Sequence, residues 1–412
     1  MDLQERIARR RSAHQGREIV VDRDHLSPVV HRAEPVGRGP VLERLLDEFE
    51  PVFDSELPPP IAVDGPAGSG TSAIVTALFD ALNERLGEST RSIGTTTRAG
   101  SMGPITWFVY VDGRRVESAF AFYRTVLSVL STESVPASGV GTDEFRERLR
   151  DRLDRPNHRA VIALDHHDEP ETLSYERVRD LLEPVDGSVS TVAVGQTVPD
   201  RWDDEQPTVS VPDYRHHELV DIVTDRASTG LAAGALAHES ARELATWAEG
   251  NAHDALAALF GAGVLANADG SDRLESHHLE TARADVPDNG VHLDRALALS
   301  ETRQRVLLDL IAVDSTDTPI RDVATKIADR SSLTTGTVKR FLYELADRGV
   351  IERVPLPANG SGRRPSAVVP RFPTIAFRAL GPDSNGDETE ADGASEGEAA
   401  ETPHGDLPDS SP

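Results

Sequence analysis

The sequence predicts an α/β protein in which a parallel sheet with helices on both faces is followed by a helical lid and a C-terminal winged helix. Short apolar strands alternate with helical segments up to about residue 210. Four helical segments then follow without a strand, and three further helices precede two strands. The expected units are a polar N-terminal arm at 1–34, the sheet domain at 35–210, the lid at 211–290, the winged helix at 291–380 and an acidic disordered tail at 381–412.

Each expected element rests on the spacing of its apolar residues. Strands are short apolar runs, whereas helices carry apolar residues three and four positions apart. The prolines at 58–60 exclude a longer first helix. The expected strands are 61–63, 106–111, 161–164, 191–194, 351–356 and 367–369. The expected helices are 41–53, 73–86, 118–130, 145–153, 218–227, 240–248, 253–266, 277–284, 301–313, 320–329 and 335–348.

The chain is strongly acidic, with a formal net charge of −27 at pH 7. Nearly all of its basic residues are arginine, since Lys326 and Lys339 are the only lysines. This composition resembles that of proteins from salt-in halophilic archaea, because at molar salt the Debye length falls to about 3 Å and dense acidic charge repels little. An acidic mesophilic protein is the alternative. Overall acidity therefore does not argue against nucleic-acid binding.

The composition also excludes several classes of site. There are no cysteines, which excludes disulfides, thiolate metal sites and cysteine nucleophiles. No run of 18 apolar residues occurs. The polar, arginine-rich N-terminus lacks the apolar segment of a signal peptide. We therefore expect a cytoplasmic protein with no membrane partner.

A glycine-rich turn between a strand and a helix fits the phosphate-loop pattern G-x-x-x-x-G-K-[ST] at every fixed position but one. Backbone N–H groups of such a turn converge on phosphate oxygens at a helix N-terminus. Thr71 replaces the lysine, and loss of that charge-assisted hydrogen bond costs about 1.5–3 kcal/mol. A ligand-free turn is the alternative. The predicted nucleotide-binding residues are Gly65, Pro66, Ala67, Gly68, Ser69, Gly70, Thr71 and Ser72.

A second partial motif follows, because the apolar run 161–164 ends in Asp165. This is the form of a Walker B strand, and Asp165 and Ser72 are the predicted Mg²⁺ ligands. His166 stands where a glutamate would polarise the attacking water. A transition-metal site at 165–169 is the alternative, although adjacent residues at a strand end point to opposite faces. Surface positions are expected for the histidine pairs at 216–217 and 277–278.

Taken together, these motifs resemble those of the archaeal origin-recognition initiators, AAA+ relatives of the eukaryotic origin-recognition and cell-division-cycle loader ATPases. Gln196 falls in the sensor-1 strand, where an asparagine is usual. His253 falls in the sensor-2 motif in place of the usual arginine. The resemblance covers most of residues 20–375. It is carried by the segments 22–28, 36–38, 65–72, 161–166, 192–196, 212–226 and 250–256.

The resemblance implies an AAA+ sheet domain with a helical lid, and double-stranded DNA as a partner, with related initiator subunits as further partners. It also implies a nucleotide site that includes Asp165, Gln196 and His253. The residues that contact the terminal phosphate in the family are replaced by Thr71, His166 and His253. We therefore expect weak binding of ATP or ADP with Mg²⁺, and no residue is assigned a catalytic role.

The predicted winged helix is a local basic region, with thirteen Lys or Arg against nine Asp or Glu between residues 300 and 380. Its third helix has polar residues at its N-terminal half, where a recognition helix contacts the major groove. Two adjacent arginines at the tip between the strands suit phosphate or minor-groove contacts. A protein-binding winged helix is the alternative. The predicted DNA-binding residues are Thr335, Thr337, Lys339, Arg340, Arg363 and Arg364.

Three functions remain open from the sequence. The first is a DNA-binding initiator-like protein with degenerate ATPase motifs. The second is a transcription regulator that reuses the initiator scaffold. The third is an active ATPase with an atypical phosphate loop, which requires a lysine or arginine supplied from elsewhere.

Overall fold

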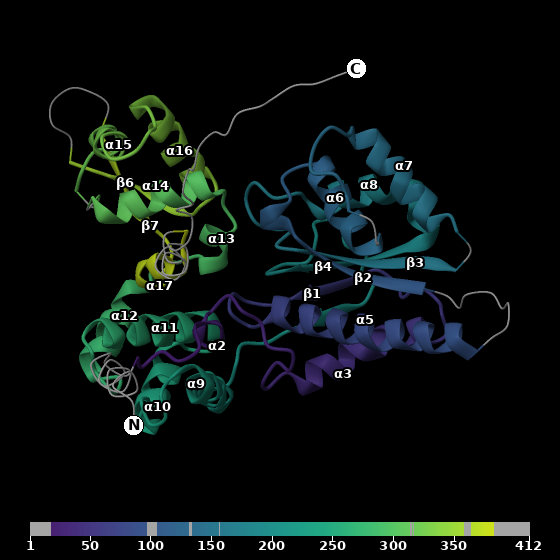
Figure 1. Ribbon diagram of the computed structural model, residues 1–412, viewed down its shortest axis with the longest axis horizontal. Coiled ribbons are helices and arrows are strands. Elements are labelled where there is room, and N and C mark those ends of the chain that lie inside the picture. The colour runs from purple at the N-terminus through teal and green to yellow at the C-terminus, as the bar shows by residue number, and fades with distance from the viewer. Residues whose placement is uncertain are drawn as a thin grey trace, which may run out of the picture.

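The computed structural model describes residues 18–96, 105–131, 134–155, 157–313, 315, 317–357 and 364–382 (Figure 1). Residues 1–17 of the predicted arm and residues 383–412 of the predicted tail lie outside the described residues. Arg363 also lies outside them. Within the described ranges, no helix combines the length and apolar character needed to span a membrane.

A five-stranded parallel sheet forms the centre of the N-terminal lobe (Figure 1). Its strands lie in the order β2-β3-β4-β1-β5, and every adjacent pair is parallel. Parallel neighbours need crossover connections, which helices provide here. The fold class predicted from alternating strands and helices is confirmed. The strands are β1 (Ile61–Asp64), β2 (Ile105–Asp112), β3 (His158–Asp165), β4 (Val189–Gly195) and β5 (Thr208–Ser210).

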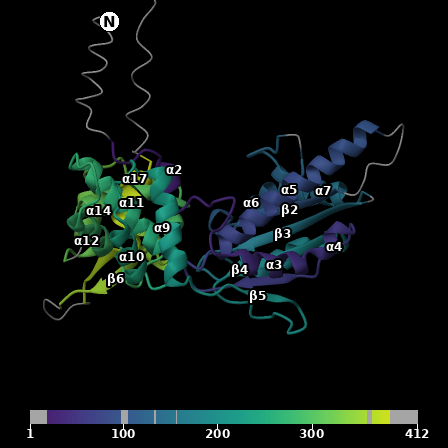
Figure 2. The same cartoon turned by 90° about the horizontal axis from the view of Figure 1, so that it is seen from below.

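Helices cover both faces of this sheet (Figure 2). Consecutive residues of β3 point to opposite faces, so that Ile162 packs in one apolar cluster and Ala163 in the other. This burial on both sides explains why the strand is apolar throughout. One face carries α3 (Gly39–Glu48), α4 (Glu50–Phe53) and α5 (Thr71–Thr96), and the other carries α6 (Ala119–Leu130), α7 (Thr142–Leu153) and α8 (Tyr175–Leu182).

Several elements of this lobe differ from the predictions. The helix predicted at 41–53 breaks at Phe49, and Pro51 lies in the first turn of α4, where a missing N–H costs little. Helix α5 continues past its predicted end at residue 86. Neither α8 nor β5 is predicted, although Ser174 caps α8 by accepting from the Arg177 N–H at 3.2 Å. Strand β5 buries only its middle residue, which is too short a pattern to recognise.

The lid consists of the four helices that the sequence predicts. The central one, α11, is buried around most of its circumference because helices pack on it from several sides. This explains its nearly uniform apolar sequence. The lid helices are α9 (His216–Gly230), α10 (His238–Trp247), α11 (Ala252–Ala268) and α12 (Ser276–Asp285).

The C-terminal unit has three helices followed by an antiparallel hairpin, which is the element order predicted for a winged helix. Thr334 caps α16, since its Oγ1 accepts from the Thr337 N–H at 3.2 Å. Gly349 follows the helix with a φ of +68°, a conformation that favours glycine. Helices α13 and α17 are not predicted. The elements are α13 (Leu293–Leu297), α14 (Glu301–Ala312), α15 (Ile320–Ala328), α16 (Thr335–Asp347), β6 (Ile351–Pro355), β7 (Ser366–Pro370) and α17 (Thr374–Leu380).

The lid and the C-terminal unit share one apolar core and form the second lobe (Figure 1). Helix α17 returns to pack on α11, and Phe377 is fully buried in this core. Asp285, at the end of α12, accepts hydrogen bonds from the Thr374 hydroxyl and from the Ile375 N–H, the latter at 2.7 Å. The two units predicted on either side of residue 290 are therefore packed together.

The described part of the predicted N-terminal arm is also built into this lobe. Ile19 and Leu26 are buried in the shared core. Arg226 of α9 donates to the backbone oxygens of His25 at 3.0 Å and Val30 at 2.7 Å. The short helix α2 (Arg23–Leu26) packs on α9. The segment therefore lines the junction between the lobes.

Candidate functional site

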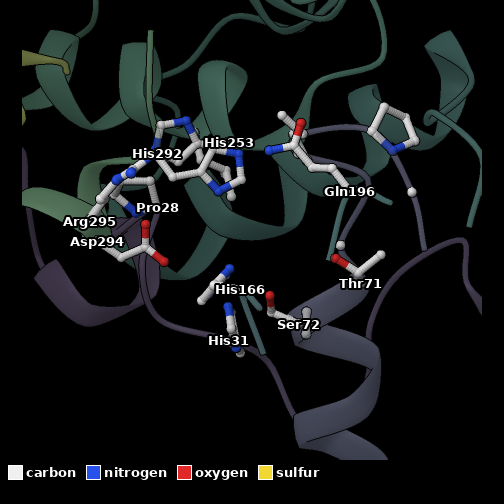
Figure 3. Close-up of a pocket in the computed structure, with 18 of the residues that line it drawn as sticks. Pro28, His31, Thr71, Ser72, His166, Gln196, His253, His292, Asp294 and Arg295 are labelled. Atoms are coloured by element: carbon white, nitrogen blue, oxygen red, sulfur yellow. The ribbon is translucent and has the colours of Figure 1, made fainter. Parts of the chain in front are cut away.

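A cavity of about 390 Å³ lies between the two lobes, at the carboxyl end of the sheet (Figure 3). Ligands of open α/β sheets bind at this edge. Its walls come from the N-terminal segment, the phosphate loop, the ends of β3 and β4, the lid, and the segment around α13. From the predicted nucleotide site it is lined by Gly65, Pro66, Ala67, Gly68, Gly70, Thr71, Ser72, Gln196 and His253.

The phosphate loop has the backbone that phosphate binding requires. Gly68 and Gly70 have φ values of +75° and +85°. Helix α5 begins at Thr71, and the first N–H groups of a helix have no partner within the helix. Thr71 and Ser72 line the cavity, whereas Ser69 is fully buried beneath it. The loop therefore fits a diphosphate, but it supplies no positive side chain.

Buried contacts hold the loop in place. Arg38 donates to the Ser69 oxygen at 2.6 and 3.0 Å and to the Pro212 oxygen at 2.8 Å, and its guanidinium lies 3.5 Å from the centre of the Tyr214 ring. The Gly68 oxygen accepts from the Ala252 N–H at 3.1 Å. The loop is thus clamped between the sheet lobe and the lid.

The predicted Walker B residue does not line the cavity. Asp165 is fully buried, and its carboxylate accepts from the Tyr110 hydroxyl and from the His166 N–H at 2.8 Å. Burial and the neighbouring Asp165 raise the pKa of Tyr110, so the hydroxyl keeps its proton. His166 does line the cavity, with a φ of +59°. Its Nδ1 lies 3.5 Å from Asp165 Oδ1 and 3.8 Å from Glu169 Oε1.

The two predicted sensor residues, Gln196 and His253, are held in different ways. Asp168 fixes the end of β4, since its Oδ2 accepts from the N–H groups of Gln196 at 2.8 Å and Thr197 at 2.9 Å. His253 is buried, and its two ring nitrogens are both engaged. Nε2 accepts from the Leu293 N–H at 2.8 Å, and Nδ1 lies 3.0 Å from Asp254 Oδ1. An acceptor Nε2 leaves His253 neutral, so it does not replace the sensor arginine's charge.

Several residues that line the cavity are not predicted from the sequence. His31 lines the cavity from the N-terminal segment (Figure 3). His292 stacks on His253 with ring centres 4.2 Å apart, and burial lowers its pKa well below the ordinary value. Arg114 and Asp294 also line the cavity and form an ion pair. They come from an ordinary 3₁₀ turn and an unpredicted helix, so no motif marks them.

The transition-metal alternative at 165–169 is not supported by the geometry. Among the described residues, the group that could hold a metal ion is Asp269 with His277 and His278, and it includes no residue of 165–169. His278 Nδ1 accepts from the Glu275 N–H at 3.1 Å, so a neutral ring carries its proton on the Nε2 that faces Asp269. The prediction that His278 is a surface residue is wrong, because it is buried where it caps α12.

The predicted DNA-binding residues of α16 lie together on an exposed surface. Thr335, Lys339 and Arg340 are exposed, while Thr337 is half-buried and its hydroxyl lies 3.0 Å from that of Thr334. Lys339 is next to Tyr343, whose ring centre is 5.9 Å from the ammonium. The opposite side of the helix is buried.

The hairpin adds basic residues beside this surface. Arg364 is exposed, and its Nε donates to the Leu356 oxygen at 2.7 Å, which fixes the side chain at the base of the hairpin. Arg353 of β6 lies 5.0 Å from the centre of the Tyr343 ring, on the side of the hairpin near α16. Arg353 is absent from the predicted set because its strand position carries no signal of its own.

The sheet lobe matches a known family model. The model described as "AAA ATPase domain" matches residues 34–193. This stretch includes the phosphate loop, β3 and most of β4, which are the elements that build the sheet side of the cavity.

Curated relatives extend the similarity over most of the chain. ORC1-type DNA replication protein 1 of Sulfurisphaera tokodaii is 23% identical over 359 residues, which cover 81% of this chain and 85% of the relative. ORC1-type DNA replication protein 14 of Haloarcula marismortui is 24% identical over 376 residues, with 81% of each chain covered.

Solved structures show the same fold. The Aeropyrum pernix ORC1 protein in complex with DNA has a TM-score of 0.59 and 21% identity, covering 88% of this chain and 96% of that one. The Aeropyrum pernix ORC2 protein in its ADPNP-ADP complexes has a TM-score of 0.50 and 15% identity, covering 88% and 99%. The resemblance inferred from the motifs is confirmed. The chain is similar to the archaeal ORC1-type DNA replication proteins over most of its length, and residues 34–193 match the model of an AAA ATPase domain.

Proposed function

We propose that this chain is a DNA-binding protein of the replication-initiator type whose AAA+ unit binds nucleotide weakly and does not hydrolyse ATP. The DNA-binding part rests on one observation above all. In a chain with a net charge of −27, exposed Lys339 and Arg340 lie on the N-terminal half of a helix that precedes an antiparallel hairpin. That is the geometry with which recognition helices enter a major groove. The DNA-bound relative of the same fold supports this assignment.

The nucleotide part rests on the loop and on the AAA ATPase match. The loop amides suit a diphosphate, while Thr71 supplies no charge for a third phosphate. If Mg²⁺ accompanies the nucleotide, Ser72 and Asp165 are the proposed ligands, and Asp165 would first have to release the Tyr110 hydroxyl. Since His166 stands where a glutamate would orient the attacking water, we infer that hydrolysis is lost.

Mapping the chromosomal binding sites of the tagged protein tests the DNA-binding role. We expect discrete sites close to replication genes, and their loss in a variant that carries both Lys339→Ala and Arg340→Ala. Sites confined to promoters would instead favour a transcription regulator built on the initiator scaffold. No difference between wild type and variant would contradict the assigned DNA-binding surface.

Hydrolysis is tested separately with purified protein at high KCl. We expect negligible ATP turnover in the wild type. A turnover rate that matches an intact initiator and disappears in Asp165→Ala would show an active ATPase, and the catalytic cation would then have to be sought among the cavity arginines.

A further inference from the structure

The C-terminal unit supplies one wall of the cavity. Val291, His292, Asp294 and Arg295 line it, although they are more than 200 residues away from the phosphate loop in sequence. Figure 3 shows His292, Asp294 and Arg295 on the side of the cavity that faces His166 and Ser72. A molecule on the loop would therefore lie against α13 as well as against the sheet.

Arg114 joins this wall to the sheet lobe. Its side chain is only 5% exposed, and it bonds Glu169 of its own lobe through two nitrogens, Nε to Oε2 at 2.8 Å. Its remaining nitrogen, Nη1, pairs with Asp294 of α13. Arg295 lies 3.4 Å from Glu169. Two arginines and two carboxylates thus balance one another across the junction of the lobes.

Polar atoms on the same wall lack partners. Asp294 Oδ1, Arg295 Nη2 and His292 Nε2 are buried and accept or donate no hydrogen bond among the described residues. An unsatisfied buried polar group costs roughly 1–3 kcal/mol. On the wall of a cavity, such atoms are available to a ligand that reaches them.

Few cations among the described lining residues can meet a third phosphate near Ser72. Thr71 is neutral, and His253 Nε2 accepts from the Leu293 N–H. Of the lining arginines outside the α13 wall, Arg226 and Arg371 donate to backbone oxygens of their own lobe, and Arg32 of the N-terminal segment lies 4.0 Å from Asp225. On the wall that α13 forms with the sheet lobe, a third phosphate gains a strong charge partner from the arginines that already bind Glu169 and Asp294.

We propose that Asp294 and the third phosphate of a nucleoside triphosphate compete for Arg114, so that a triphosphate releases α13 and with it the C-terminal unit. A diphosphate leaves the Arg114–Asp294 pair intact and the unit docked. The inference rests on the proposed nucleotide binding. It makes Arg114 and Asp294 the residues that distinguish the two nucleotides, and it links the cavity to the orientation of α16.

The test compares two charge-neutralising variants. Asp294→Asn removes the competing charge and leaves Arg114 paired with Glu169. Glu117→Gln removes a docking contact outside the cavity, the ion pair with Arg348 at 2.7 Å. Affinities for ADP and for a non-hydrolysable ATP analogue are measured on the full chain at high KCl, with the thermal midpoint as a check of folding.

We expect Asp294→Asn to bind the ATP analogue about tenfold more tightly than wild type, since one close like charge is removed, with ADP affinity unchanged. Glu117→Gln weakens docking without altering the cavity, so by linkage it should also favour the ATP analogue over ADP, but by less than Asp294→Asn does. Equal effects of Asp294→Asn on both nucleotides would overturn the inference. Failure of wild type and variants to bind either nucleotide would instead remove the nucleotide part of the proposed function, and this inference with it.

Docking of the C-terminal unit on the sheet lobe is measured by fluorescence resonance energy transfer between the two lobes. The chain has no cysteine, so Asp151→Cys on α7 and Asp322→Cys on α15, both at exposed positions, give two defined labelling sites. We expect the ATP analogue to change the transfer efficiency in wild type and ADP to leave it unchanged. An ATP-analogue complex with the transfer efficiency of the free protein would overturn the inference even if the affinities differ.

Discussion

At the scale of single residues, the phosphate loop depends on contacts that no side chain of the loop makes. Arg38 donates to the Ser69 oxygen within the loop and to the Pro212 oxygen of the segment that leads into the lid, and the Asn251 side chain lies against Gly68. A Cβ on Gly68 would lie 1.8 Å from Asn251 Oδ1, which also caps α11 by accepting from the Asp254 N–H. The glycine is therefore required by its neighbour as well as by its backbone.

Gly68→Ala should destabilise the fold by more than its backbone strain alone. A left-handed alanine costs about 1–2 kcal/mol, and displacement of Asn251 adds the loss of a helix cap, about 1 kcal/mol. Gly234→Ala is the matched control, because Gly234 has a φ of +79° and no atom within 4 Å of an added Cβ. Urea unfolding measures both variants. Equal losses would show that the contact with Asn251 has no energetic weight.

The proposed recognition helix, α16, and the hairpin should make different kinds of contact with DNA. Arg340→Ala should reduce discrimination between specific and scrambled duplexes, since a base contact contributes about 1–3 kcal/mol. Arg364→Ala should weaken both duplexes alike and lower the salt slope by about one, as loss of a phosphate contact does. Arg150→Ala, at an exposed position on α7, is the control. Identical effects of the first two variants would refute the division of roles.

Acidification should destabilise the fold through His292. Burial and the stacked His253 lower its pKa, while Asp294 opposes them less strongly. A histidine with a lowered folded-state pKa binds fewer protons than in the unfolded chain, so stability is present above pH 6.5 and falls as the pH drops below it. Thermal midpoints from pH 7.5 to 5.5 should fall less in His292→Gln than in wild type. The control variant His217→Gln, at an exposed histidine, should lose as much thermal stability as wild type. The same fall in thermal midpoint for all three proteins would contradict a role of His292 in acid destabilisation.

At the scale of elements, α17 joins the apolar cores of the lid and the C-terminal unit into one. Phe377 is fully buried and packs against Phe372 at 4.8 Å between ring centres. Three residues separate the end of the hairpin from this helix, which returns to α11, so the unit is tied to the lid at both of its ends.

Phe377→Ala should therefore destabilise the whole second lobe, by about 3–5 kcal/mol. Phe53→Ala, at a side chain that is 57% exposed, is the control and should have little effect. Hydrogen exchange should show lid and C-terminal amides losing protection together in the first variant. Loss confined to the C-terminal amides would indicate two independently folding units.

The sequence predicts long or strongly patterned elements well and short ones poorly. The apolar strands and the helix stripe of Val338, Phe341, Leu342 and Leu345 follow directly from burial. Helix α13 has only five residues, and its Asp294 pairs with Arg114, which lies far away in sequence. The phosphate loop is visible as a local pattern, whereas the ion pairs that complete the cavity arise only when the lobes pack together.

At the scale of the molecule, positive charge is concentrated in the unit that we propose binds DNA, whereas the part of the chain with the nucleotide cavity is acidic. The predicted winged helix carries a local balance of +4, while residues 1–299 carry −21. Strong salt dependence is expected of phosphate contacts, and counterion release contributes less affinity at molar salt. Specific binding under those conditions must therefore come mainly from base and shape contacts made by the C-terminal unit.

The most direct test of the account is a binding titration of the full chain across KCl concentrations, with and without ATP, on a mapped chromosomal site and a scrambled duplex. Wild type should prefer the mapped site without nucleotide. A variant with Lys339, Arg340, Arg363 and Arg364 all replaced by alanine should lose both the preference and most of the affinity. Unchanged affinity in that variant, or site preference only in the presence of ATP, would contradict a DNA-binding role of the C-terminal unit that is independent of hydrolysis.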